Sequence, residues 1–344
     1  MSFTHGTVKT RYWHRLNDGR VVCDLCPREC SLRDGKRGAC FVRQAIDGEI
    51  VLTSYGRSSG FAIDPIEKKP LNHFYPGSKV LSFGTAGCNL GCKFCQNWNI
   101  SKSRKMDTIA MEASPEQIAK IAAYEECKSV AFTYNDPVIF MEYAVDTAIA
   151  CHELGIKSVA VSAGYISTEP RVEFYKHMDA ANIDLKAFTE RFYRKMCSGH
   201  LTPVLETLQY LKHETDVWLE VTTLLIPGEN DSDSELEAMC LWIYENLGSD
   251  VPLHFSAYHP DFKIVDIPRT PLQTLLKARK IALGQGINHV YIGNAIDPES
   301  ESTLCPGCKR KVIERERYFV KNNRVTKQGK CPFCDTSIPG HFDS

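Results

Sequence analysis

The fold follows from one stretch of sequence, Gly84-Thr-Ala-Gly-Cys88-Asn-Leu-Gly-Cys92-Lys-Phe-Cys95-Gln-Asn-Trp-Asn99. It places three cysteines at the spacing C-x3-C-x2-C in a glycine-rich loop, directly after the apolar residues 80–83. Three thiolates so close together can occupy three corners of one cubane iron–sulfur cluster, whereas a closed structural metal site requires four ligands. A zinc site or a chance group of core cysteines fits the pattern poorly. The missing fourth ligand would leave one iron open to a molecule that is not protein.

The composition is that of an ordinary globular protein. The chain has 344 residues, of which 43% are hydrophobic and 24% charged, and its net charge is −1. This length fits two or three domains, or one α/β barrel with additions. A nearly neutral chain gives no electrostatic reason to expect a nucleic-acid or membrane partner. No apolar run reaches bilayer length and the first residues lack the apolar region of a signal peptide, so we expect a cytoplasmic protein.

The chain has fifteen cysteines, and their spacing is more informative than their number. Most fall into three sets: Cys23, Cys26, Cys30 and Cys40; Cys88, Cys92 and Cys95; and Cys305, Cys308, Cys331 and Cys334. The remaining cysteines stand in apolar or helical contexts and are interpreted as buried core thiols: Cys127, Cys151, Cys197 and Cys240. Disulfides are not expected in a reducing compartment. The sequence therefore predicts three metal sites.

Residues 1–76 are predicted to form an N-terminal module around the first cysteine set. Proline and glycine stand between its cysteines, which lets four thiolates fold around one metal centre with little hydrophobic core. The metal could be zinc or an auxiliary iron–sulfur cluster, because four thiolates suit both. Four ligands close the site, so we expect a structural or electron-relay role rather than catalysis.

Residues 298–344 are predicted to form a second small module. Cys305-Pro-Gly-Cys308 and Cys331-Pro-Phe-Cys334 are C-x2-C knuckles on either side of the basic, β-rich residues 310–330. This pattern is typical of a zinc ribbon or a rubredoxin-like site that holds one tetrahedral metal. We expect structural zinc, with a mononuclear redox iron as the alternative.

Residues 77–297 alternate short β-rich runs with helical stretches. Strands are predicted at 80–84, 129–133, 158–162, 182–186, 217–223, 253–257 and 290–293. Helices are predicted to begin near Ser114, Pro137, Thr168, Pro203, Ser232 and Thr270. Such alternation indicates a parallel sheet with right-handed crossovers. We predict an α/β fold, a partial (β/α)6 TIM-like barrel with its chemistry at the carboxyl ends of the strands.

Polar residues and glycines near the carboxyl ends of these strands are the candidate binding residues: Tyr134, Asn135, Ser162, Gly164, Asp184, Lys186, His254 and Asn294. Gly164 would let a backbone approach a ligand. Asp184 and Lys186 share one face of their strand, where an unpaired carboxylate or ammonium would be costly. Structural alternatives remain: a helix-starting turn, a salt bridge that closes the barrel, or a buried histidine bonded to backbone.

The cysteine loop, with the aromatic Phe94 before its third cysteine, resembles the radical S-adenosylmethionine (SAM) superfamily. The resemblance implies that the open iron of a [4Fe-4S] cluster chelates SAM, and that one electron cleaves the sulfonium to give methionine and a 5′-deoxyadenosyl radical. Tyr134 and Asn135 stand where superfamily members have a Gly-Gly-Glu-like segment that receives the SAM amino group. Only their position carries over, because the residues differ.

Further site residues follow from a similarity to glycyl-radical activating enzymes. Asp184 and Lys186 resemble the Asp-x-Lys that lies near the SAM carboxylate in those enzymes, and His254 matches one of their histidines. Asn294 follows the last strand, where adenine or ribose would rest. All three expectations place the residues around one SAM molecule.

Four segments together point to one group of this superfamily. They are the N-terminal Cys-x-Leu-Cys-Pro-x-x-Cys, the run Asp64-Pro-Ile-Glu-Lys-Lys-Pro-Leu, the cysteine loop, and Thr133-Tyr-Asn-Asp-Pro137. They resemble the radical SAM component of the AmmeMemoRadiSam system, a relative of the pyruvate formate-lyase activating enzymes. Asp136 departs from the pattern, in which glutamate is expected. The resemblance implies Memo-like and AMMECR-type protein partners, and the chemistry implies a flavodoxin- or ferredoxin-like electron donor.

Three functions are weighed on the sequence alone. The first is a radical SAM enzyme that abstracts hydrogen from an unidentified substrate. The second is an activating enzyme that generates a glycyl radical in a protein partner. The third is a non-catalytic adaptor with metal in all three sites, and a three-cysteine loop at the catalytic face of a barrel argues against it.

Overall fold

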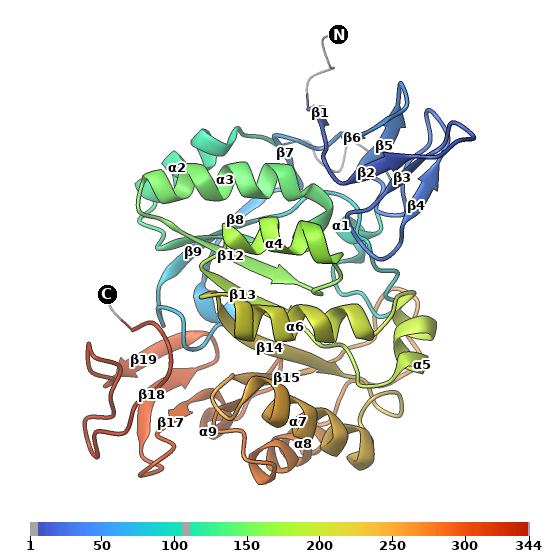
Figure 1. Ribbon diagram of the computed structural model, residues 1–344. Coiled ribbons are helices and arrows are strands. Elements are labelled where there is room, and N and C mark those ends of the chain that lie inside the picture. Colours follow the sequence, from blue (N-terminus) through green and yellow to red (C-terminus); the bar gives the residue numbers. More distant parts are fainter. Residues whose placement is uncertain (1–5, 105–110, 343–344) are drawn as a thin grey trace.

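The computed structural model describes residues 6–104 and 111–342, and its centre is a large eight-stranded sheet (Figure 1). The strand order is β16-β15-β14-β13-β12-β11-β9-β8, and all neighbours from β9 to β16 pair in parallel. The parallel strands are β9 (Lys79–Phe83), β11 (Ser129–Phe132), β12 (Lys157–Ser162), β13 (Ala180–Asp184), β14 (Trp218–Leu225), β15 (Leu253–Ala257) and β16 (Val290–Gly293). The predicted α/β partial barrel is confirmed.

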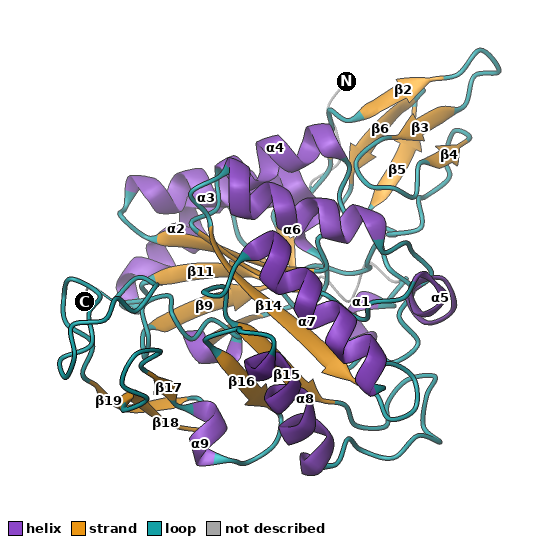
Figure 2. Cartoon of the chain, turned by 60° about the horizontal axis from the view of Figure 1, so that its bottom comes forward, coloured by secondary structure: helices purple, strands orange, loops and turns teal. Residues whose placement is uncertain are grey.

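Helices cover the outer face of this sheet (Figure 2). They are α2 (Pro115–Tyr124), α3 (Met141–Glu153), α4 (Thr168–Lys176), α6 (Thr202–Glu214), α7 (Asp233–Leu247) and α8 (Leu272–Gly284). The shorter helical segments are η1 (Ile66–Lys68), α1 (Trp98–Ser101), η3 (Pro137–Phe140), α5 (Glu190–Phe192) and the π-helical η4 (Tyr193–Cys197). Within the described ranges, no helix has both the length and the apolar character needed to span a bilayer.

Local cap chemistry explains where these helices begin. At α2 the Ser114 hydroxyl accepts the Gln117 N–H at 3.3 Å, and the Gln117 side chain accepts the Ser114 N–H at 2.7 Å. At α8 the cap is Pro271, one residue later than predicted. The hydroxyl of Thr270 is already bonded to the Tyr258 N–H and the Leu225 carbonyl, so it does not cap the helix.

The barrel begins earlier in the chain than the predicted boundary at residue 77. β8 (Phe61–Pro65) pairs antiparallel with β9, from Phe61 opposite Phe83 to Pro65 opposite Lys79. These residues were predicted to belong to the N-terminal module, within residues 1–76, because Pro65 and weak periodicity hide the strand. Proline is tolerated here because β8 is the edge strand and Pro65 is its last residue.

The residues before β8 form two three-stranded sheets at one end of the barrel (Figure 1). One contains β1 (Val8–Lys9), β6 (Glu49–Leu52) and β5 (Arg43–Ile46); the other contains β2 (Trp13–Arg15), β3 (Val21–Cys23) and β4 (Cys30–Leu32). In addition, β7 (Arg57–Ser58) pairs with β10 (Met111–Glu112). The buried Arg43 donates to both carboxylate oxygens of Glu142 on α3, at 3.1 and 2.6 Å. This ion pair fixes the module on the barrel.

The C-terminal module covers the opposite end of the barrel (Figure 1). It contains α9 (Pro298–Glu301) and a sheet of β17 (Thr303–Leu304), β18 (Lys311–Glu316) and β19 (Phe319–Asn323). The buried Arg315 pairs with Glu67 at 3.4 Å and donates to the carbonyl of Asn72. Both partners lie in the connection between β8 and β9, at the amino ends of the parallel strands. The module therefore closes the barrel end away from the predicted site.

His289 lies near this closed end and makes stability depend on pH. Burial lowers the pKa of His289 to about 4, whereas the ordinary value is 6.5. Above pH 6.5 the side chain is neutral in both states, so the full stability is present. As the pH falls from 6.5 toward 4, only the unfolded chain takes up this proton, and we expect a loss of up to about 3 kcal/mol.

Urea unfolding of the wild type and of His289→Leu at neutral and mildly acidic pH measures this effect. The wild type should lose more stability than the variant over that range, since the variant lacks the titrating group. Equal losses in both proteins would contradict the assignment.

Candidate functional site

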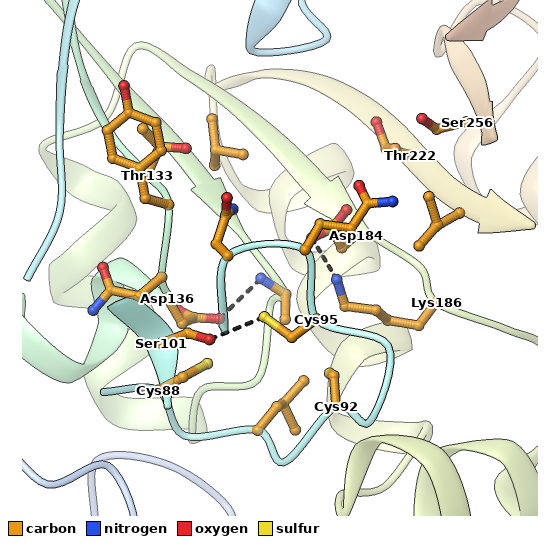
Figure 3. A pocket seen from close by; sticks show the side chains of 18 of the residues that line it. Cys88, Cys92, Cys95, Ser101, Thr133, Asp136, Asp184, Lys186, Thr222 and Ser256 are labelled. Atoms are coloured by element: carbon orange, nitrogen blue, oxygen red, sulfur yellow. Dashed lines mark hydrogen bonds and ion pairs between the residues drawn. The ribbon is translucent and has the colours of Figure 1, made fainter. Parts of the chain in front are cut away.

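A cavity of about 630 Å³ opens at the carboxyl ends of the parallel strands (Figure 3). Its walls come from β8 and residues 68–70, from the cysteine loop after β9, from the segment 133–136 after β11, and from residues on or just after β12 to β15. Cys88, Cys92 and Cys95 all line it. The structure thus brings the three cysteines of the loop to the barrel end where the chemistry of such folds resides.

The three thiols have separate surroundings. Burial raises the pKa of Cys88 to about 12, whereas a hydrogen bond from the Cys197 thiol lowers the pKa of Cys92 to about 6. The sulfur of Cys95 lies 2.9 Å from the Ser101 hydroxyl. The three sulfurs do not all lie within 4.8 Å of one another. Sulfurs that bind one metal ion would lie within that distance. Three corners of a cluster require this wider separation, because each thiolate binds a different iron.

Backbone contacts with η4 support the cysteine loop. The Gly91 N–H donates to the Cys197 carbonyl at 2.7 Å, and the Lys93 N–H donates to the Met196 carbonyl at 2.9 Å. A Cβ on Gly91 would lie 2.7 Å from the Ser198 hydroxyl, so glycine permits this approach. Cys197 was interpreted as an ordinary core thiol, and it is fully buried, but it also contacts Cys92.

Asn135 holds the first residues of the cysteine loop. Its amide nitrogen donates to the Gly87 carbonyl at 2.9 Å and to the Thr85 hydroxyl at 3.2 Å, and its oxygen accepts the Thr85 N–H at 3.1 Å. Asn135 also lines the cavity, but its hydrogen bonds are committed to the loop. In this structure it is a positioning residue.

Asp184 and Lys186 form an ion pair inside the cavity, with 2.6 Å between Oδ2 and Nζ (Figure 3). β13 ends at Asp184, so Lys186 lies beyond the strand that was expected to carry both residues. Burial opposes the charge of Lys186, but the Asp184 carboxylate holds the pKa of Lys186 above its ordinary value. The cavity therefore contains a fixed cation beside a carboxylate at neutral pH.

Tyr134 forms the wall next to the segment that precedes β9. Its φ of +69° is uncommon for a residue with a side chain and marks local backbone strain. The ring lies 5.0 Å from Lys69 Nζ, and the hydroxyl donates to Asp64 Oδ2 at 3.4 Å. Asp64 and Lys69 belong to the Asp-Pro-Ile-Glu-Lys-Lys-Pro run, for which no role was predicted. The structure places this run at the cavity.

Phe94 also lines the cavity, and its ring packs at 5.6 Å from that of Phe192. The neighbouring Asp136 accepts the Ser162 hydroxyl at 3.0 Å and the N–H groups of Val138 and Ala163 at 3.1 and 2.9 Å. Burial raises the pKa of Asp136. The short carboxylate joins η3 to the end of β12.

Four predicted binding residues lie outside the lining of this cavity: Ser162, Gly164, His254 and Asn294. The hydroxyl of Ser162 is used by Asp136 and by the Gly164 N–H. Asn294 bonds to the Ala257 carbonyl at 3.3 Å and faces a different hollow. Ser162 ends β12 and Asn294 follows β16, but the polar groups of both side chains are engaged by neighbouring residues.

His254 lies deeper in the barrel than the lining of the cavity. It is the second residue of β15, and its Nε2 lies 2.6 Å from Glu220 Oε2 in the buried interior. The cavity is instead reached by Ser256, two residues closer to the carboxyl end. Both residues lie on the same face of the strand, and the alternation of side chains predicts that face. Their position along the strand determines that Ser256, and not His254, lines the cavity.

The cavity contains residues that the sequence did not single out as ligand contacts: Asp64, Lys69, Gln96, Ser101, Lys102, Thr222 and Ser256. Strand alternation could have nominated Thr222, whereas no pattern marks the loop residues. The buried Thr222 Oγ1 and Gln96 Nε2 have no hydrogen-bond partner in the described part of the chain. Buried polar atoms are normally paired, so both point to a ligand in the cavity.

These residues fit a [4Fe-4S] cluster with SAM. Three cysteine sulfurs supply three iron ligands, and the fourth ligand is absent from the loop. The unpartnered Thr222 hydroxyl and the Lys186 ammonium line the space in front of the cysteines. The donor set therefore agrees with the cofactor pair that the sequence predicts.

The C-terminal cysteines form a second, closed metal site. The sulfurs of Cys305, Cys308, Cys331 and Cys334 all lie within 4.8 Å of one another. The Cys305–Cys334 and Cys308–Cys331 sulfur distances are 3.5 and 3.7 Å. Tetrahedral zinc with bonds of about 2.3 Å places its sulfurs about 3.8 Å apart. The geometry suits one ion, at the barrel end opposite the cavity.

Gly87 should be essential for the cysteine loop. Its φ is +85°, and a Cβ there would lie 1.9 Å from the Cys40 carbonyl. We expect Gly87→Ala to displace the loop and to lose at least half of the iron that the loop binds after reconstitution. Gly19→Ala is a matched control, because Gly19 has a φ of +82° and open space around it. The control should retain its iron, and equal iron contents in both variants would contradict the clash argument.

The fold and the site define a class, an α/β partial barrel with a three-cysteine loop at the mouth of its cavity. Residues 83–240 match the Radical SAM superfamily. An uncharacterized protein of Methanocaldococcus jannaschii is 39% identical over 328 residues, which cover 95% of this chain and 97% of that protein. The chain belongs to the radical SAM superfamily.

More distant proteins agree with this membership. The 4-hydroxyphenylacetate decarboxylase activating enzyme of Clostridioides difficile is 20% identical over 166 residues, covering 45% of this chain and about half (52%) of that enzyme. A radical SAM methyltransferase from Sphaerobacter thermophilus has the same fold, with a TM-score of 0.52, 13% identity, and coverage of 84% of this chain and 78% of its own. The chain is a radical SAM enzyme related to activating enzymes.

Proposed function

We propose that Cys88, Cys92 and Cys95 hold a [4Fe-4S] cluster whose open iron binds SAM. Together, the cluster and SAM would supply reductive cleavage of SAM to a 5′-deoxyadenosyl radical, which abstracts hydrogen from a substrate. The observation that carries this proposal is that the three cysteines line the same cavity as the Asp184–Lys186 pair. Superfamily membership supports it.

The protein residues have distinct parts in this proposal. The Lys186 ammonium attracts the SAM carboxylate through a charge-assisted hydrogen bond, and Asp184 fixes the direction of that ammonium. Thr222 and Gln96 offer their unpaired polar atoms to the ligand. Asn135 keeps the start of the cysteine loop in place.

An anaerobic assay tests the proposal. The protein is reconstituted with iron and sulfide, reduced with dithionite and incubated with SAM, and both 5′-deoxyadenosine and methionine are measured. We expect the two products in equal amounts. If a protein with a complete cluster forms neither product, the proposal is wrong.

A second candidate is the activation of a protein partner by formation of a glycyl radical. Similarity to the 4-hydroxyphenylacetate decarboxylase activating enzyme favours it. Electron paramagnetic resonance of a candidate partner after turnover decides: a glycyl doublet in the partner supports this function, and radical formation only on small molecules contradicts it.

The finer family and the partners are also proposals. The four sequence segments described above support a place in the AmmeMemoRadiSam system, with Memo-like and AMMECR-type partners. The one-electron chemistry requires a donor of the flavodoxin or ferredoxin type. Co-purification of the tagged chain with such partners from its own host tests both assignments.

A further inference from the structure

We propose that the four N-terminal cysteines hold an iron–sulfur cluster rather than zinc. This site, formed by Cys23, Cys26, Cys30 and Cys40, is separate from the cavity at the strand ends. The sequence allowed both metals, because four thiolates suit either. The spacing of the sulfurs decides for the cluster, independently of any SAM chemistry.

The four cysteines come together from one hairpin and one loop. Cys23 ends β3 and Cys30 begins β4, and the two are direct partners across the antiparallel pair. Cys26 lies in the turn between these strands, and Cys40 lies shortly before β5. All four line one small cavity, and all are free thiols. Four thiols that converge on one internal hollow form a built site.

The sulfurs stand too far apart for one ion. No three of these four cysteines have sulfurs within 4.8 Å of one another, although the complete C-terminal set does. Ligands of a single zinc, with bonds of about 2.3 Å, would be as close as those of the C-terminal set. In a cubane cluster each cysteine binds a different iron, and the sulfurs are separated by the width of the cluster. The N-terminal set shares this wider spacing with Cys88, Cys92 and Cys95.

The surroundings suit an anionic cluster. Arg43 and Arg28 both line the hollow, and the Arg43 guanidinium is at the same time paired with Glu142. The Ala39 N–H donates to the Cys30 sulfur at 3.4 Å, and the N–H groups of Leu25 and Arg28 bond to the sulfurs of Cys23 and Cys26. Positive charge and N–H···S bonds stabilise the negative charge that a cluster places on its thiolates.

This site is in contact with the loop that carries the first cluster. Asn89, the residue after Cys88, lines the N-terminal hollow. Arg28 donates to the Asn89 carbonyl and, at 2.6 Å, to the Ser198 carbonyl. The Cys40 carbonyl occupies the space that a side chain on residue 87 would take. Two clusters would thus lie on either side of one short segment of backbone.

The content of labile sulfide tests the proposal, because a zinc or mononuclear iron in the C-terminal site contributes no sulfide. In the variant Cys88→Ala, Cys92→Ala, Cys95→Ala, only the N-terminal set can hold a cluster. After anaerobic reconstitution we expect about four sulfides per chain in this variant, and about eight in the wild type. Reduction with dithionite should give the electron paramagnetic resonance signal of a reduced cluster.

Adding Cys23→Ala and Cys26→Ala to that variant should remove the sulfide and the signal. The content of the C-terminal metal serves as the control for folding. A folded three-alanine variant that binds zinc at the N-terminal set and contains no sulfide would overturn the proposal. If that variant does not fold, the wild type decides, and about four sulfides instead of eight would overturn it. A loss of SAM cleavage alone concerns only the cluster proposed at Cys88, Cys92 and Cys95. The proposed function and the proposed N-terminal cluster can therefore be disproved independently.

Discussion

Replacing Cys88, Cys92 and Cys95 together by alanine is expected to reduce 5′-deoxyadenosine formation to background, a loss of more than about 10³-fold. The three thiols are the cysteines that line the cavity, and no other cysteine of the described chain lines it. Without them nothing holds an iron beside the Asp184–Lys186 pair. The assay is the anaerobic product analysis described above.

The matched control is Cys240→Ala. Cys240 is fully buried on α7 and does not line the cavity, so this variant should keep its activity and lose only a small part of its stability. Circular dichroism of the three-alanine variant checks that the barrel remains folded. SAM cleavage by that variant above one-tenth of the wild-type rate would contradict the assignment of the loop.

Arg43→Met is expected to destabilise the protein by about 3–5 kcal/mol, because it leaves the Glu142 carboxylate buried without its cation. The Arg43 side chain is 1% exposed, and the Glu142 side chain 10%. This pair also anchors the N-terminal module, since Arg43 belongs to β5 and Glu142 to α3. Urea unfolding measures the loss, and limited proteolysis should cut the N-terminal module first.

Two further variants show whether Arg43→Met destabilises the protein through the unpaired Glu142 carboxylate or through lost packing. The double variant Arg43→Met, Glu142→Leu removes both charges and should recover a large part of the stability. Lys277→Met breaks the exposed pair with Asp233 and should cost at most about 1 kcal/mol. If Arg43→Met cost no more than this surface variant, the anchoring role would be wrong.

Most of the barrel could be predicted because its strands are short apolar runs with clear boundaries. The predicted strands at 253–257 and 290–293 coincide with β15 and β16, and the others differ by a few residues. β8 was missed because Pro65 and weak periodicity obscure an edge strand that only its pairing with β9 reveals. Local sequence patterns therefore predict the strands and helices of the barrel. The edge strand β8 is defined by its pairing with β9, which no local pattern shows.

The candidate site was predictable only in part. The cysteine spacing and the Asp184–Lys186 pair could be read from the sequence, because the chemistry itself fixes those residue types. His254 and Ser256 share a strand face, and only the three-dimensional depth shows that Ser256 reaches the cavity. The contact between Cys92 and Cys197 joins residues far apart in the chain, and no local pattern marks it.

The contact of Arg315 with the connection between β8 and β9 has a consequence for folding during synthesis. Arg315 is 248 residues from Glu67 and 243 from Asn72. Contacts over such separations form slowly, and residues near the amino end leave the ribosome first. Glu67 therefore remains without its cation until Arg315 has been synthesised. The closure of this barrel end is a late step of folding, and it depends on the module that also carries the C-terminal cysteines.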